Sequence, residues 1–144
     1  MKIKTFKGKI VDGGQDKIHL SGGDSDKGYR IASLKIMSLN PGADLQESVV
    51  KVYKNKQSSV DGQVDFTDDN LLGAAYLETH GEPWYIDGDQ VTFDREVVNQ
   101  DIFVTHKDIA VGATINYYIE LEEIKMSGAE QANVNFSAAL LHGE

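Results

Sequence analysis

The four histidines are the residues best suited to bind a metal ion or to transfer a proton, and they are scattered along the sequence. They are His19, His80, His106 and His142. No two of them have the i, i+2 or i, i+4 spacing that commonly presents two imidazoles to one metal ion. We therefore expect single histidines at the surface or on strand faces. A site assembled from distant strands stays open as an alternative.

Carboxylates form two groups, and neither has the spacing of a known site. The segment Asp24–Gly28 is similar in composition to a calcium loop, but an EF-hand requires a glutamate where Leu34 stands. A looser calcium loop completed by Asp12 or Asp16 is the alternative to a solvated turn. A second group of aspartates, within residues 65–94, is typical of turns, although paired carboxylates can also hydrolyse glycosides.

Other catalytic signals are missing from the sequence. The chain has no cysteine, which excludes a disulfide framework, a thiolate metal site and a cysteine nucleophile. It also has no glycine-rich phosphate loop and no G-x-S-x-G nucleophile motif. The sequence therefore predicts a protein that is not an enzyme, with no cofactor and no metal.

Aromatic and basic residues give the strongest indications of binding. The only tryptophan, Trp84, stands next to Tyr85 in a Gly- and Pro-containing loop. Such a loop can present an aromatic platform to a sugar ring or to another subunit, or the tryptophan can pack on its own core. The first segment is rich in lysine, which is typical of a defended sheet edge and equally of a surface that docks on an acidic partner. We place the candidate interface at Lys2, Lys4, Phe6, Lys7, Lys9, Trp84 and Tyr85.

Short apolar runs separated by glycines predict an all-β chain. We expect strands over residues 2–11, 17–20, 29–39, 49–54, 71–78, 84–86, 91–93, 101–105 and 116–126. The tail from Ala129 alternates like a further strand, but it also has the composition of a helix. The resulting fold is an antiparallel β-sandwich, jelly-roll-like, with about eight to ten short strands in a single domain over residues 1–144. Residues 1–9 are expected to be an edge strand or an arm.

Details of several segments follow from the alternation of side chains. In the first strand Ile3, Phe6 and Ile10 are expected in the core, with a bulge near Thr5 or Gly8 where the alternation slips. Further core residues are expected at Ile31, Leu34 and Ile36. Alternation also places Val50 with Val52, Ile102 with Val104, and Ile115 with Tyr117, Ile119 and Leu121 on one face of their strands. Asp12-Gly13-Gly14 and Asn40-Pro41-Gly42 predict turns, and Asp87-Gly88-Asp89 predicts the turn of a hairpin.

Charge is distributed unevenly along the chain. Residues 1–60 hold 11 Lys and Arg against 6 Asp and Glu, a net +5, whereas residues 61–144 hold 3 against 17, a net −14. Basic strands can pair with acidic strands inside one sheet, and complementary surfaces can also join identical subunits head to tail. The total of −9 argues against a nucleic-acid partner. No apolar run is long enough to span a membrane, and MKIKTFKGKI does not have the pattern of a signal peptide.

An ordered series of β segments gives the chain a resemblance to a known class of proteins. The segments are VDGGQDKIHL, GYRIASLKIM, VVKVYKNKQSSVDGQVDFTDDNLLGAAY, VVNQDIFVTHKD and NYYIELEEIKM. In their amino-acid sequences and their order, these segments resemble small β-sandwich virion structural proteins of marine tailed phages and related environmental viruses. The resemblance implies a capsid decoration, cement or head-fibre protein on the virion surface.

Two functions from different classes are compatible with these observations. The first is a structural protein that decorates or cements an icosahedral capsid. It would act as a homo-oligomer, with a trimer favoured, and its partner would be the major capsid protein of a phage. The second is a carbohydrate-binding β-sandwich of a virion appendage or a secreted protein, in which Trp84 stacks on a glycan and Asp87 or Asp89 accepts its hydroxyl groups.

Overall fold

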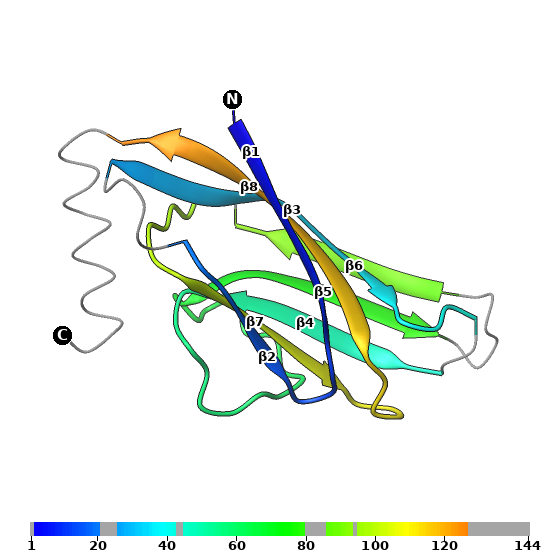
Figure 1. The fold of residues 1–144 in the computed structure, drawn as a ribbon. Helices are drawn as coiled ribbons and strands as arrows, with labels where there is room; N and C mark the ends of the chain where they lie inside the picture. The colour runs from blue at the N-terminus through cyan, green and yellow to red at the C-terminus, as the bar shows by residue number, and fades with distance from the viewer. Residues whose placement is uncertain (1, 21–25, 43–44, 80–85, 94, 127–144) are drawn as a thin grey trace.

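Eight antiparallel strands in two packed sheets make up the structure, a computed structural model that describes residues 2–20, 26–42, 45–79, 86–93 and 95–126 (Figure 1). The strands are β1 (Lys2–Ile10), β2 (Gln15–Ile18), β3 (Lys27–Ser38), β4 (Glu47–Tyr53), β5 (Leu71–Thr79), β6 (Ile86–Thr92), β7 (Ile102–Asp108) and β8 (Ile115–Lys125). The predicted all-β sandwich is confirmed. None of the described residues forms a helix long and apolar enough to cross a membrane.

Strand order supports the jelly-roll prediction. One sheet has the order β1-β8-β3 and the other has the order β2-β7-β4-β5-β6. A jelly roll is a folded ribbon in which strands equidistant from the two ends of the chain lie side by side, and the pairs β1–β8, β2–β7 and β4–β5 follow this rule. The exception is β6, which pairs with β5 but still lies close to β3 across the sandwich.

The core lies between the two sheets and contains the residues that the alternation predicted. On β8, Ile115, Ile119 and Leu121 are fully buried, and Tyr117 is buried beside them. The Tyr117 hydroxyl donates a hydrogen bond of 3.1 Å to Asp16 Oδ2 on the facing sheet. The side chains between these residues point outward, because successive residues of a strand face opposite sides of a sheet.

Core predictions on the other strands are confirmed with one partial exception. Fully or almost fully buried are Ile10, Ile31, Leu34, Val50, Val52, Ile102 and Val104, and Ile36 is partly buried. Leu71–Thr79, whose composition also suits a helix, forms β5 as predicted. The first five residues of β5 are all buried, which explains why its sequence begins with an apolar run instead of alternating.

Two predictions about β1 are wrong. Its pairing with β8 runs without a register shift from Lys2 to Ile10, so it has no bulge near Thr5 or Gly8. Ile3, predicted to be buried, is 41% exposed on the outward side of the strand. Strict alternation is kept because every residue of β1 has a partner on β8. The same pairing makes β1 the edge strand of its sheet, which is one of the two predicted alternatives.

The predicted hairpin turn at Asp87-Gly88-Asp89 is also wrong. These residues lie within β6 and pair with residues 76–78 of β5. An Asp-Gly pair favours a turn only locally, and here the long partner strand keeps the chain extended. Gly88 is needed for a different reason, because a Cβ at this position would lie 2.7 Å from the backbone oxygen of Tyr76. The prediction for the tail from Ala129 lies outside the described residues.

Residues 54–70, which we call the covering loop, cross the outer face of the five-stranded sheet. Lys51, on that face of β4, is only 3% exposed because the loop lies over it. Its ammonium group donates to Asp61 Oδ1 at 2.8 Å and to the backbone oxygen of Gln63. The neighbouring Gln57 N–H donates to Gln15 Oε1 of β2 at 2.9 Å. The loop is thus anchored to two strands of the sheet.

Candidate functional site

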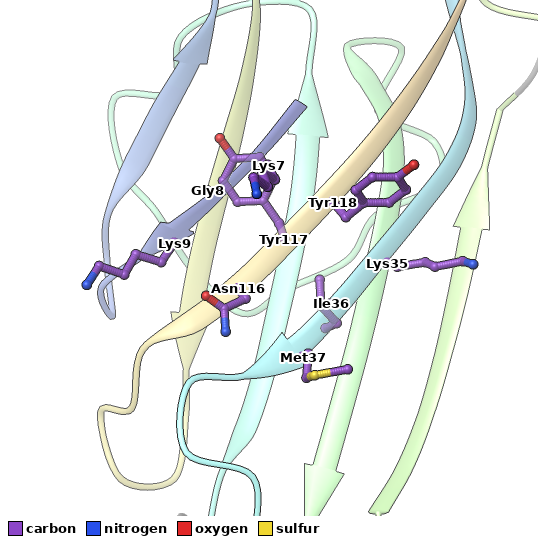
Figure 2. A pocket seen from close by; sticks show the side chains of 9 residues that line it. All are labelled: Lys7, Gly8, Lys9, Lys35, Ile36, Met37, Asn116, Tyr117 and Tyr118. Carbon is purple, nitrogen blue, oxygen red and sulfur yellow. The ribbon is translucent and has the colours of Figure 1, made fainter. Parts of the chain in front are cut away.

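Three lysines surround a depression on the outer face of the three-stranded sheet. The strand register places Lys7 and Lys35 on either side of Tyr118. The next row consists of Lys9, Asn116 and Met37 in the same arrangement. Figure 2 shows these side chains on the three adjacent strands around a pocket of about 560 Å³. We call this surface the lysine face, defined by Lys7, Lys9, Lys35, Met37, Asn116 and Tyr118.

The lysine face is electropositive and partly apolar. Lys7, Lys9 and Lys35 are exposed, and no ion pair joins any of them to a carboxylate of the described residues. Met37 beside them is 63% exposed. One carboxylate borders the lysine face, because Glu120, at the next outward position of β8, accepts the Tyr118 hydroxyl at 2.8 Å. The three lysines outnumber it, so the surface keeps an excess of positive charge on a chain whose net charge is −9. Such a surface suits a partner with carboxylates around an apolar group.

Tyr117 and Gly8 shape the floor of the depression. A Cβ at Gly8 would lie 2.9 Å from Tyr117 Cε1 and from its hydroxyl oxygen, so only glycine leaves room for the ring. Burial and the neighbouring Asp16 carboxylate raise the pKa of Tyr117 above its ordinary value. The uncharged ring therefore lies beneath this part of the sheet on the core side, and Gly8 allows β1 to pass close over it.

The lysines at the other end of the same sheet, two on β1 and one on β3, have a different role. Lys2, Lys4 and Lys27 lie 3.6, 3.9 and 3.5 Å from the Glu123 carboxylate. Desolvation alone would raise the pKa of Glu123, but the three ammonium groups outweigh it and lower the pKa. Lys4 also lies over the Tyr29 ring, 5.3 Å from its centroid. Part of the charge asymmetry is thus satisfied inside one sheet, as basic strands beside acidic strands would predict.

The other residues of the predicted interface are separated from this surface. Phe6 is half-buried and packs against the core, because it faces inward on β1. Trp84 and Tyr85 lie outside the described residues, so the structure places neither of them. Of the predicted set, Lys7 and Lys9 are the two that reach the lysine face.

A second surface with exposed apolar side chains lies at one end of the sandwich. The connections β1–β2, β3–β4 and β7–β8 meet there (Figure 1). They carry Val11, Leu39, Ile109 and Val111, which are 64%, 40%, 54% and 59% exposed. We call these four residues and their connections the loop end. Large exposed apolar side chains that share one end of a domain make that end a candidate interaction surface.

A buried carboxylate holds the loop end in shape. Asp108 is 3% exposed, and its oxygens accept backbone N–H groups of Glu47 and Ala110 at 3.0 Å each and of Ala113 at 2.6 Å. Asp12 in turn accepts the Asp108 N–H at 2.8 Å, which ties the β1–β2 turn to the same cluster. Burial alone would raise the pKa of Asp108, but the backbone donors lower it overall.

His106 completes the same cluster from inside the sandwich. It is fully buried, with Nδ1 2.9 Å from the backbone oxygen of Ile10 and Nε2 3.0 Å from Ser48 Oγ. Burial lowers its pKa although the carbonyls of Ile10 and Val11 oppose this effect. A neutral ring that links two strands is a structural histidine, in agreement with the prediction that the histidines lie singly on strand faces.

The sequence did not identify Lys35, Met37, Asn116 and Tyr118 as members of a site. Alternation places Lys35 and Tyr118 on outward faces of their strands. However, nothing local in the sequence indicates that β1, β8 and β3 are neighbours in that order. The signal was present only as exposed positions on three separate strands.

Metal-binding geometry and similarity to known proteins add no further site. Within the described ranges, no group of three or more His, Asp or Glu side chains is arranged to hold a metal ion. No known protein family matches the chain, and no curated protein matches it either.

Proposed function

We propose that this protein is a viral structural protein that decorates or cements an icosahedral phage capsid. It acts on the capsid surface as a homo-oligomer, with a trimer favoured, and its partner is the major capsid protein. The jelly-roll order of strands supports this proposal, since viral capsid and lectin domains both use that architecture. Fold alone does not assign function, so the argument depends on the surfaces.

The loop end is the observation that carries the proposal. Three of its exposed apolar side chains, Val11, Ile109 and Val111, lie on the β1–β2 and β7–β8 connections, which Asp108, Asp12 and His106 hold by hydrogen bonds. The fourth, Leu39, is tied to the β7–β8 connection by its N–H, which donates to the Thr114 carbonyl at 3.4 Å. Ordering a loop on binding costs free energy, and a surface that is ordered beforehand avoids this cost. A fixed apolar surface is suited to repeated docking on an equally rigid shell.

Cementing follows from preferential binding to the assembled shell. A protein that contacts neighbouring shell subunits at once binds the assembled capsid more tightly than the separate subunits. Mass action then shifts the equilibrium toward the assembled state. The apolar residues Ile109 and Val111 would supply buried area, and the charged groups around them would set the register of docking.

Co-sedimentation with capsids of the phage that encodes the protein tests this proposal. The double variant Ile109→Ser/Val111→Ser should bind at least tenfold more weakly than the wild type. Ile3→Ser, which removes another exposed apolar side chain far from the loop end, is the matched control and should bind normally. Failure of the wild-type protein to bind the capsids would refute the proposal.

The carbohydrate-binding alternative requires a separate measurement. It depends on Trp84, which lies outside the described residues. The fluorescence of this single tryptophan, followed during titration with a panel of glycans, reports directly on stacking against a sugar. A saturable change together with absent capsid binding would favour the carbohydrate function over the structural one.

A further inference from the structure

The covering loop presents an aromatic side chain among carboxylates. Phe66 is 59% exposed, and its ring packs edge-on against Phe93 with the centroids 5.4 Å apart. Asp65, Asp68 and Asp69 surround it in sequence, and Val64 beside them is 41% exposed. No lysine or arginine occurs between residues 57 and 94. Arg95 lies beside Phe66, Asp68 and Asp69 in the same hollow, together with Glu96. The carboxylates outnumber this one guanidinium, so the part of the loop around Phe66 has an excess of negative charge.

Local hydrogen bonds hold this part of the loop in a defined shape. Asp65 Oδ1 accepts the Thr67 hydroxyl at 2.6 Å and the Thr67 N–H at 2.9 Å. Both bonds lower the pKa of Asp65, so its carboxylate stays charged. Asp68 accepts the N–H of Asn70 in the same way. Phe66 is thus presented by a turn that needs little further ordering on binding.

Lysine face and covering loop lie on opposite outer faces of the sandwich. The lysine face lies on the three-stranded sheet, and the covering loop lies on the five-stranded sheet. Their chemistries are complementary, because three ammonium groups surround a depression on one face. On the other face, Asp68 and Asp69 line a hollow with the exposed Phe66 ring, and Asp65 precedes the ring in sequence. One chain therefore carries both halves of a contact that it cannot make with itself.

We propose that two copies of this chain associate head to tail, with Phe66 of one copy inserted into the depression of the lysine face of the next. In this contact Asp65, Asp68 and Asp69 pair with Lys7, Lys9 and Lys35, and Met37 and Tyr118 receive the ring. The inference deepens the homo-oligomeric part of the proposed function and rests on it. A heterologous contact of this kind closes into a ring only if its rotation divides a full turn, and otherwise it extends into a row.

A mixture of two variants, each lacking one half of the contact, tests the proposal directly. Lys7→Ser/Lys35→Ser removes the basic half, and Asp65→Ser/Phe66→Ser removes the acidic half. Each variant alone should remain monomeric in sedimentation velocity at a concentration where the wild type associates. An equimolar mixture should form a discrete dimer and nothing larger, because one intact half of each kind remains. Lys125→Ser, at an exposed lysine on the same sheet, is the control and should associate like the wild type.

Several results would overturn the inference. One is a wild type that stays monomeric at low salt up to its solubility limit. Another is association that the two double variants leave unchanged, or a mixture that forms no dimer. If the wild type is monomeric and the lysine variant loses capsid binding, the lysine face docks on the shell instead. Conversely, a dimer in the mixture of the two variants, together with no capsid binding by the wild type, would support this contact and refute the proposed capsid role.

Discussion

Replacing Asp108 with asparagine isolates the contribution of the carboxylate that holds the loop end. The substitution keeps the shape of the side chain and removes its charge. Three backbone N–H groups, from Glu47, Ala110 and Ala113, point at the two carboxylate oxygens. An asparagine offers one oxygen to these donors, and its NH₂ group faces the others.

The expected loss of stability follows from the number and type of these hydrogen bonds. A hydrogen bond to a charged group contributes about 1.5–3 kcal/mol, and a buried donor left without a partner costs about 1–3 kcal/mol. The bonds share one carboxylate, so their contributions do not add fully. We therefore expect Asp108→Asn to lower the free energy of unfolding by about 3 kcal/mol. Asp89→Asn, at an exposed site on β6, should change it by less than about 0.5 kcal/mol.

Urea unfolding at several pH values is the assay, and the sign of the pH effect is fixed by the direction of the shift. The pKa of Asp108 is lower in the folded state than in the unfolded state, where it is about 3.9. Its contribution is therefore fully present above about pH 3.9 and is lost as the pH falls through the folded pKa. The difference between wild type and Asp108→Asn should shrink in that acidic range. Equal stabilities at neutral pH, or a difference that persists unchanged into strong acid, would refute the reasoning.

Three further predictions concern the core and the strands. Leu34→Ala should lower the free energy of unfolding by about 3 kcal/mol in urea titrations, because Leu34 is 1% exposed, whereas the 40%-exposed Leu39 should tolerate alanine with little change. Gly88→Val should lower the melting temperature by several degrees, because its Cβ would lie 2.7 Å from a backbone oxygen of β5. In an ultraviolet titration Tyr117 should ionise at a higher pH than an exposed tyrosine, and Asp16→Asn should reduce this difference. An unchanged stability, melting temperature or titration curve would contradict the corresponding prediction.

Side-chain alternation made much of the sandwich predictable from the sequence. The residues from Ile115 to Leu121 alternate so regularly that their buried face could be assigned directly. Prediction was weaker where the local preference of a segment differs from the conformation that pairing with a distant strand imposes. The Asp-Gly pair at Asp87 and Gly88 favours a turn locally, but the pairing with β5 keeps it extended.

The candidate site was only partly predictable for a related reason. Lys7 and Lys9 were identified because they belong to a lysine-rich segment. Lys35 and Tyr118 belong to strands that are about 80 residues apart in sequence and adjacent in the sheet. Adjacency of that kind is a property of the topology, and a local pattern does not encode it. Similarly, nothing in the sequence indicated that Lys4 would be neutralised by Glu123 while Lys7 would remain without a carboxylate partner among the described residues.

The burial of Lys51 makes one amine of this protein a reporter of local opening. Its side chain is 4% exposed beneath Asp61, and no other lysine of the described part of the chain is buried to this extent. An amine-reactive reagent will therefore modify Lys51 only when the covering loop has lifted from the sheet. The rate of its acylation, read by mass spectrometry against that of the exposed lysines, measures how often this loop opens while the rest of the fold stays intact.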